Sequence, residues 1–355
     1  MNPEFKTLDQ MIRRVVKKYN SFIICPFGDC GMKTKEILNK RYGIQETAIL
    51  DNGLADYNPQ IFKVNRLCEM DTRGAVILLN TMDRKINNLL FRQIREIDAK
   101  VSIANVQDEL VVWDCPEKAR WFRHLKQLLS VKEVKGIPLV RIGRDYDGGY
   151  IMPDDFNSTL RAYSFGISND VSWDKDIASR GIEVFMYDPT IPCLPEENSH
   201  FHFYKKGISG KDIPEEDLFS METILDWNGD SNNRNLILKM DVEGAEWEFL
   251  EDVSSEVLGQ FIQMTFEWHD VVNIPSTLLR KIIEKINCTH QVVWLHGNNC
   301  AAAVRGGEIL MPFALEITFV RKEDYEFTKS ESVYPLSIDM PNNPNKPDHI
   351  LGNWG

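Results

Sequence analysis

The chain has 355 residues, of which 43% are hydrophobic and 26% charged, and it carries a net charge of −12. This length favours two domains, and the composition is that of an ordinary soluble globular protein. The acidic balance excludes broad binding to nucleic-acid backbones or anionic membranes, because such contacts need an excess of Lys and Arg. A local basic pocket remains compatible with it.

The cysteines are scattered and form no CxxC pair, which fits neither a disulfide framework nor a zinc ribbon. The N-terminus has no apolar core of signal-peptide length, and no apolar run approaches the roughly 20 residues that span a bilayer. We therefore expect a soluble, cytoplasmic protein without membrane insertion. We also expect free thiols, which is the usual state in a reducing compartment, at Cys25, Cys30, Cys68, Cys115, Cys193, Cys288 and Cys300.

Residues 1–110 are predicted to form a small Rossmann-like domain. A strand, a glycine turn with Gly28 and Gly31, a helix and a second strand ending in Asp51 make a βαβ unit of the nucleotide-binding kind. The GxxG spacing is not the full GxGxxG fingerprint, so a nucleotide site and a plain tight turn remain alternatives. The predicted elements are strands at 22–25, 74–80 and 101–108, a strand ending at 51, and helices to about 41 and at 87–97.

Residues 111–136 are predicted to form a connecting helix, because Trp121, Leu125 and Leu128 recur at helical spacing. The Pro- and Asn-rich residues 331–355 are expected to form no regular structure. Leu351 and Trp354 are the side chains expected to hold this tail against the body of the protein.

Residues 137–330 are predicted to form the second α/β domain. Its sheet is expected to be mostly parallel, with an antiparallel edge, since too little helix separates the last two strands for a crossover. The predicted strands are 160–166, 182–188, 200–208, 235–241, 261–269, 291–297 and 313–321, with helices beginning at 172, 244 and 276.

Ligands of such sheets gather where the strands end and helices begin. Gly166 follows the first long strand, where a glycine would let a ligand lie against the backbone, and Ser168 and Asn169 are hydrogen-bonding residues beside it. Asp188 ends the next strand at a distance, about 20 residues, that suits an acid binding the ribose hydroxyls of an adenosine. Gly207 and Ser209 lie at the end of the following strand, where the adenine edge would lie.

The stretch LILKMDVEGAEWEFL, residues 236–250, joins a buried strand to an amphipathic helix. Asp241 stands at the tip of the strand, where the reactive end of a cofactor would point. Glu243 is either a cap for the positive helix N-terminus or a functional acid. Gly244 is expected to permit close packing as the helix starts.

The run LKMDVEGAEWEFL closely resembles the signature of FkbM-type methyltransferases, which use S-adenosylmethionine and often methylate sugar hydroxyls. Two further stretches, RIGRDYDGGYIMPDD at 141–155 and WLHGNN at 294–299, look like other motifs of the broader family. The resemblance covers about 137–350 and excludes 1–110. It implies a Rossmann-like fold that binds S-adenosylmethionine and transfers its methyl group to oxygen.

The resemblance also implies which residues hold the cofactor. Asp147, Gly148 and Gly149 would close over it, and Arg141 or Arg144 would meet its methionine carboxylate. The implied set is Arg141, Asp147, Gly148, Gly149, Gly166, Ser168, Asn169, Asp188, Ser209 and Asp241.

Methyl transfer to a hydroxyl is an in-line displacement that needs a proton acceptor or a metal ion. Glu267 and His269 alternate along one strand and therefore share a face. With Asp241 they make either a metal-free base cluster, which we favour, or a site for a divalent ion. The candidate catalytic residues are Asp241, Glu243, Glu267, His269 and His296.

The function we expect is S-adenosylmethionine-dependent O-methylation of a hydroxyl of a saccharide or related polyhydroxylated small molecule, either free or activated by a nucleotide. One alternative is an NAD(P)-dependent sugar oxidoreductase that uses residues 22–51. Another is a non-catalytic module that binds S-adenosylmethionine or a nucleotide. A homo-oligomer is left open, and no nucleic-acid partner is expected.

Overall fold

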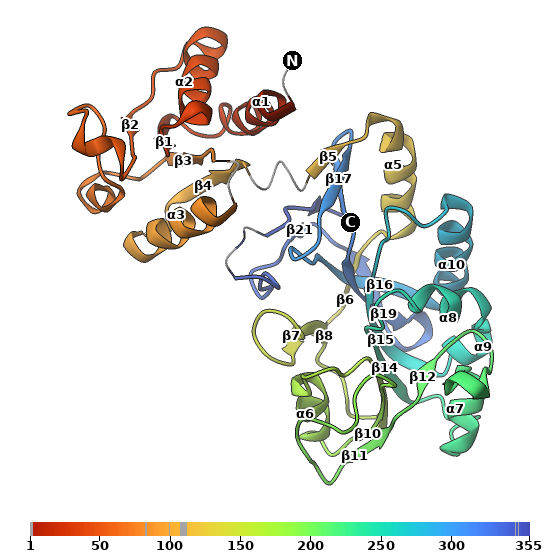
Figure 1. The fold of residues 1–355 in the computed structure, drawn as a ribbon. Helices are drawn as coiled ribbons and strands as arrows, with labels where there is room; N and C mark the ends of the chain where they lie inside the picture. Colours follow the sequence, from red (N-terminus) through yellow and green to blue (C-terminus); the bar gives the residue numbers. More distant parts are fainter. Residues whose placement is uncertain (1–2, 82–83, 99, 107–111, 345, 347) are drawn as a thin grey trace. The chain divides into compact units, whose positions relative to one another are not determined.

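A computed structural model describes residues 3–81, 84–98, 100–106, 112–344, 346 and 348–355 (Figure 1). The chain divides into two compact units, Met1–Trp113 and Asp114–Gly355, each of which is considered by itself. The seven cysteines, all of which lie within the described residues, form no disulfide. Within the described ranges, no helix combines the length and the apolar character needed to cross a bilayer.

The first unit contains a parallel four-stranded sheet in the order β2-β1-β3-β4. Alternate side chains of its strands face opposite layers: Phe22 and Ile24 pack with α1 and α2, whereas Ile23 and Cys25 pack with α3. The predicted strand at 101–108 is shorter, and positions 107 and 108 lie outside the described residues. The elements are α1 (Pro3–Val15), β1 (Ser21–Cys25), α2 (Asp29–Tyr42), β2 (Ala48–Ile49), β3 (Ala75–Leu79), α3 (Arg84–Ile97) and β4 (Ser102–Asn105).

The glycine turn of this unit has a packing explanation. A Cβ atom on Gly31 would lie 2.4 Å from the backbone oxygen of Pro26, so the turn admits no side chain there. The Asp51 carboxylate accepts hydrogen bonds from the backbone N–H groups of Phe27, Gly53 and Leu54, each at 2.9 Å. Gly31 and Asp51 therefore both stabilise the conformation of this turn.

The second unit is organised around a seven-stranded sheet in the order β11-β10-β9-β14-β15-β19-β16. Only β19 runs antiparallel to its neighbours, β15 and β16. The expected antiparallel strand is present as β19, but it lies one place in from the edge of the sheet. It pairs with β15 on one side and with β16 on the other, so β16 is the edge strand. The strands are β9 (Arg161–Phe165), β10 (Glu183–Tyr187), β11 (Phe201–Tyr204), β14 (Leu236–Met240), β15 (Phe261–Trp268), β16 (His290–Gly297) and β19 (Leu315–Arg321).

Helices cover this sheet on both sides, with α6 on one side and α7 to α10 on the other (Figure 1). The spacing of buried residues explains the longest of them, α10, which buries Leu279, Ile282, Ile283 and Ile286 at i, i+3, i+4 and i+7. The helices are α6 (Ser172–Ala178), α7 (Met221–Trp227), α8 (Glu246–Asp252), α9 (Ser255–Leu258) and α10 (Ser276–Thr289).

The segment expected to be one long connecting helix is mixed. Its helix, α5 (Ala119–Leu128), follows the strand β5 (Val112–Asp114) and precedes β6 (Lys132–Val134), which pairs with β20 (Phe327–Lys329). The buried side chains are Phe122, Leu125 and Leu129, so the predicted apolar face at Trp121 and Leu128 is rotated by one position.

Short strand pairs complete the second unit. Strands β7 and β8 pair antiparallel, as do β17 and β18, while β12 and β13 pair in parallel. Their bounds are β7 (Leu139–Ile142), β8 (Tyr150–Pro153), β12 (Gly207–Ile208), β13 (Leu218–Phe219), β17 (Ala303–Gly306) and β18 (Ile309–Pro312).

The C-terminal tail is held as expected, since Leu351 and Trp354 are buried. The Trp354 backbone oxygen accepts a hydrogen bond of 2.7 Å from the Val131 N–H. One short ladder, β21 (Val333–Tyr334) with β22 (Gly352–Asn353), was not expected from the composition. Val333 and Tyr334 have high strand propensity, and pairing with them outweighs the low propensity of Gly352 and Asn353.

Candidate active site

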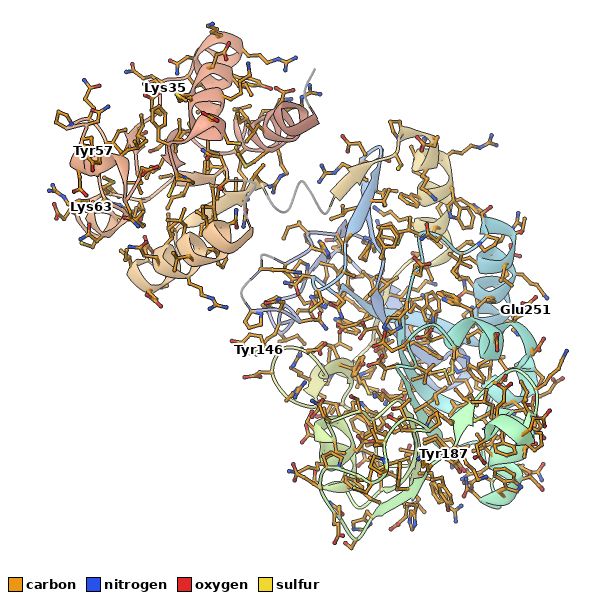
Figure 2. The ribbon with its side chains drawn as sticks, in the orientation of Figure 1. Lys35, Tyr57, Lys63, Tyr146, Tyr187 and Glu251 are labelled. Atoms are coloured by element: carbon orange, nitrogen blue, oxygen red, sulfur yellow. The ribbon has the colours of Figure 1, made fainter. Side chains whose placement is uncertain are left out.

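A cavity of about 380 Å³ opens where β9, β10 and β14 end. Tyr187, labelled in Figure 2, is the last residue of β10 and forms part of its wall. Arg141, Gly149 and Ser209 do not line this cavity, and neither do Glu267, His269 and His296. The predicted residues that do line it are Asp147, Gly148, Gly166, Ser168, Asn169, Asp188, Asp241 and Glu243, together with Arg144.

Arg141 shapes the loop between β7 and β8. Its guanidinium donates to the backbone oxygens of Arg144, at 2.9 Å, and of Tyr146, at the exposed tip of that loop (Figure 2). A Cβ atom on Gly149 would lie 2.2 Å from the Arg144 oxygen, so this glycine is required by the turn itself. Of the two predicted arginines, Arg144 is the one that borders the cavity, 3.3 Å from the carboxylate of Asp170.

Gly166 is required by the approach of two strand ends. A Cβ atom there would lie 1.6 Å from the backbone oxygen of Asp241, and the backbone has φ of 77°. The expected reason, room for a ligand, is therefore secondary to the contact between the ends of β9 and β14. Gly244 differs from expectation in the opposite way: no atom lies within 4 Å of its Cβ position, and its φ of 108° is what favours glycine.

Asp188 holds the loop that follows β9. One carboxylate oxygen accepts from the N–H groups of Ile167 and Ser168 at 2.9 and 2.8 Å, and the other accepts from the N–H and hydroxyl of Thr190 at 2.8 and 2.6 Å. Burial raises the pKa of Asp188, but these hydrogen bonds outweigh burial and lower it overall. A ribose bound here would share a carboxylate that already accepts hydrogen bonds from the loops after β9 and β10.

Ser209 is buried behind the cavity, with its N–H bonded to the Phe219 oxygen at 3.0 Å. The wall expected from Ser209 is instead apolar and comes from Ile208 and Leu218. These residues were missed because paired two-residue strands give no sequence pattern.

The cavity lining contains two buried ionisable side chains, Lys239 and Asp174, that the sequence did not lead us to expect there. Lys239, in β14, donates from Nζ to the backbone oxygen of Gly166. Burial raises the pKa of Asp174 to about 6, against the opposing charge of Lys239. The available signal was a lysine inside the apolar run LILKM, two residues before Asp241.

Beyond Asp241, carboxylates surround the imidazole of His269. Its Nδ1 lies 2.7 Å from an oxygen of Glu246. Its Nε2 lies 3.4 Å from Glu243, 3.5 Å from Glu267 and 3.8 Å from Asp241. The structure thus brings together four of the five predicted catalytic residues, and it adds Glu246.

The protonation of this cluster follows from its charges. Burial lowers the pKa of His269, but the Glu246 hydrogen bond and the neighbouring carboxylates outweigh burial and raise it to about 9. Burial, with the charges of Asp241 and Glu316, raises the pKa of Glu267 well above its ordinary value. With a pKa of about 9, His269 is therefore an imidazolium at neutral pH, and Glu267 takes up a proton more readily than an ordinary glutamate does.

Neighbouring side chains fix the orientation of the cluster. The Tyr150 hydroxyl donates to Asp241 at 3.2 Å, and the Asn298 amide donates to Glu267 at 2.7 Å. The Trp247 indole N–H donates to the backbone oxygen of His269 at 2.7 Å. Tyr150 and Trp247 were not predicted, because their partners are distant in the sequence.

His296 is not beside His269. Its Nδ1 lies 2.8 Å from Glu316 and its Nε2 lies 2.9 Å from Asp348, and it is almost fully buried. Burial lowers its pKa, but the two carboxylates raise it to about 10. His296 therefore contacts Glu316 and Asp348 and not the group around His269, so its predicted catalytic role has no contact with that group to support it.

Two overlapping groups have the composition and spacing of a divalent-ion site. The ligand atoms of Asp241, Glu267 and His269 lie within 4.8 Å of one another, and so do those of Asp147, Glu267 and Glu316. Carboxylate oxygens alone suit hard cations such as Mg²⁺, whereas an added imidazole also suits transition metals.

A comparison with known proteins supports the resemblance to methyltransferases. No family model matches the chain. It is 30% identical over 124 residues to the probable methyltransferase-like protein 24 of Homo sapiens, a match that covers 32% of this chain and 33% of the relative. The chain thus spans about a third of that relative, and the match confirms the predicted resemblance to methyltransferases.

Among solved structures, the chain is similar to the methyltransferase FkbM from Methylobacillus flagellatus KT. That likeness covers 89% of this chain and 95% of the other, with 14% identity and a TM-score of 0.35. The Rossmann-like fold of the second unit is shown by its own strand order, with parallel strands and β19 antiparallel.

Proposed function

We propose that the chain is an S-adenosylmethionine-dependent O-methyltransferase that acts on a hydroxyl of a saccharide or related polyhydroxylated molecule. One observation carries the proposal. A single cavity extends from the loop of Gly166 and Ser168 to Asp241 and Glu243, and His269 lies beside those two acids. A cofactor at the first end would direct its reactive carbon towards the second.

The lining of the cavity suits the parts of S-adenosylmethionine. Ile208 and Leu218 offer an apolar surface for the adenine ring, and Ser168 offers a hydroxyl near the ribose. Arg144, at the rim, would meet the methionine carboxylate. The positive sulfonium group would lie near the carboxylate of Asp241.

In the transfer, the acceptor oxygen forms a bond to the methyl carbon as the carbon–sulfur bond breaks, and the acceptor loses its proton. Because His269 is already protonated at neutral pH, we assign this proton to Glu267, whose raised pKa makes it the better acceptor. His269 then holds the surrounding carboxylates in place and partly neutralises them.

A polyhydroxylated acceptor is favoured by the supply of hydrogen-bond acceptors. Asp241 and Glu243 line the cavity end, and Glu267 lies behind them. Neighbouring sugar hydroxyls donate to such oxygens, whereas an apolar acceptor would leave them unpaired. Nucleotide-activated sugars belong to the same class and should be tested with free sugars.

Two measurements test the proposal. Calorimetry should show that S-adenosylmethionine binds, and that NAD does not. Transfer of labelled methyl groups should then be sought with sugars and nucleotide sugars. A parent protein that binds neither compound would refute the cofactor assignment; binding without transfer to any acceptor would instead favour a non-catalytic module.

A further inference from the structure

We propose that the carboxylate of Asp174 binds the α-ammonium group of the ligand, and so makes the cavity specific for a ligand that ends in a free α-amino acid. The inference rests on the proposed function, because S-adenosylmethionine has such an end. It assigns a specificity-determining role to a residue outside the group of acids around His269.

The first observation is the position of Asp174. It lies in the first turn of α6, lines the cavity and is only 1% exposed. Its Oδ1 atom is buried without a hydrogen-bond partner. A buried carboxylate oxygen that stays unpaired costs free energy, and a ligand that donates a hydrogen bond removes that cost.

Three other carboxylates that line the cavity are already engaged. Asp170 accepts two hydrogen bonds within its own turn, at 3.0 and 3.1 Å, and lies 3.3 Å from Arg144. The two oxygens of Asp188 accept four hydrogen bonds from the neighbouring loops. Asp241 accepts from a tyrosine hydroxyl at 3.2 Å. Asp174 is therefore the carboxylate with most to gain from a ligand donor.

The charge of Asp174 is only partly compensated by the protein. Burial raises the pKa of Asp174 to about 6, in spite of the opposing charge of Lys239 and the neighbouring hydroxyl of Ser164. The Nζ atom of Lys239 donates to the backbone oxygen of Gly166. A second cation, supplied by the ligand, would complete the compensation of this buried carboxylate.

A zwitterionic α-amino acid supplies the charges that this end of the cavity lacks. Its carboxylate suits Arg144 at the rim, and its ammonium group, with three N–H donors, suits Asp174. The two groups are attached to one carbon atom, so binding both of them also fixes the orientation of the ligand. The apolar wall formed by Ile208 and Leu218 offers no charge that could replace this pair.

Calorimetry of the full-length protein with adenosine thioethers tests the proposal without any substitution. S-adenosylhomocysteine keeps the ammonium and carboxylate groups, its deaminated analogue lacks the ammonium group, and methylthioadenosine lacks both. The parent should bind the deaminated analogue more than about tenfold more weakly than S-adenosylhomocysteine. Equal affinities for these two compounds would overturn the proposal, whether or not any variant folds.

Asp174→Asn supplies the matched variant, since the amide keeps the shape of the side chain and removes its charge. It should bind S-adenosylmethionine and S-adenosylhomocysteine more than about tenfold more weakly than the parent does, and methylthioadenosine within about threefold of the parent. Arg144→Gln is the control for the carboxylate. It should weaken binding of S-adenosylhomocysteine but not of decarboxylated S-adenosylmethionine, whereas Asp174→Asn should weaken both.

Two patterns in the Asp174→Asn variant would overturn the proposal. An equal loss for all ligands, methylthioadenosine included, would show a purely structural role. A loss confined to S-adenosylmethionine would place Asp174 at the sulfonium group. In either case the affinities of the parent would still support the cofactor assignment. A parent that binds none of these compounds would instead refute the proposed function, and this inference with it.

Discussion

In the first unit, the acid after the second strand, Asp51, binds backbone N–H groups of its own turn. Asp188 does the same in the second unit. The units diverge at the strands that follow. In the first unit, β3 is followed by Asn80 and β4 ends in Asn105, both neutral amides. In the second, the corresponding ends carry Asp241, Glu267 and His269.

A glycine turn and a following acid are therefore common to both units, and we propose that the chemistry depends on what the next strands add. Around the Asn80 and Asn105 ends, the described residues of the first unit contain no group of His, Cys, Asp and Glu side chains spaced for a metal ion. The second unit concentrates carboxylates and imidazoles at one sheet edge. The predictions below test whether that concentration, and not the shared turn, is the active part.

The largest effect is expected at the charged cluster. Glu267→Gln and His269→Ala should each lower methyl transfer by about 10² to 10⁴-fold. The first substitution removes the proton acceptor, and the second removes the positive charge that holds the surrounding carboxylates in place. Binding of S-adenosylmethionine, measured by calorimetry, should change little. Asp51→Asn in the first unit is the control and should retain transfer. Turnover equal to that of the parent in both cluster variants would remove these residues from the mechanism.

Next in size is the contact between strand ends. Gly166→Ala should lower the free energy of unfolding by about 3 kcal/mol, because its Cβ would overlap the Asp241 oxygen and its φ is positive. Gly31→Ala in the first unit meets the Pro26 oxygen and should cost somewhat less. Gly28→Ala has open space and should be nearly neutral. Urea unfolding of the three variants gives the order, and equal losses would contradict it.

The charged cluster should also make stability depend on pH. The pKa of His269 is raised to about 9 in the folded protein, so its contribution is complete below its unfolded value of about 6.5 and is lost as pH rises through 9. We expect a loss of the order of 2 kcal/mol between pH 7 and pH 10 that is smaller in His269→Gln. Thermal unfolding across this range measures it. An identical pH dependence in both proteins would show that His269 is not the group responsible.

The smallest effect is expected at the turn of the first unit. Asp51→Asn removes one charge-assisted acceptor from backbone N–H groups and should lower the free energy of unfolding by about 1 kcal/mol. Calorimetry with NAD should show no binding before or after the change. Loss of a measurable NAD affinity on this substitution would restore the nucleotide-binding interpretation of residues 22–51.

Much of the architecture was predictable because it follows from local patterns of apolar residues in the sequence. The apolar runs that end at Cys25, Phe165 and Met240 are buried strands, as expected. The position of β19 inside the sheet was not predictable, because strand order depends on which gap remains open after the other strands have paired. The rotated face of α5 was missed for a similar reason, since tertiary packing chose Phe122 over Trp121.

The site was predictable only where its residues share a short segment. Asp241, Glu243 and His269 follow strands whose ends could be placed from the sequence. Tyr150 and Glu316 could not be found in this way, because their partners are encoded far along the chain. His296 was misplaced because a histidine at a strand end gives no indication of the direction in which its ring turns.

The C-terminal tail has a consequence for how the protein is made. Asn342 bonds to Asp147, Asp348 bonds to His296, and Trp354 bonds to Val131. During translation, the interior of the second unit therefore stays incomplete until these late residues have left the ribosome. Nascent chains stalled before that point would present an uncapped, strongly acidic hollow to the chaperones of the cell.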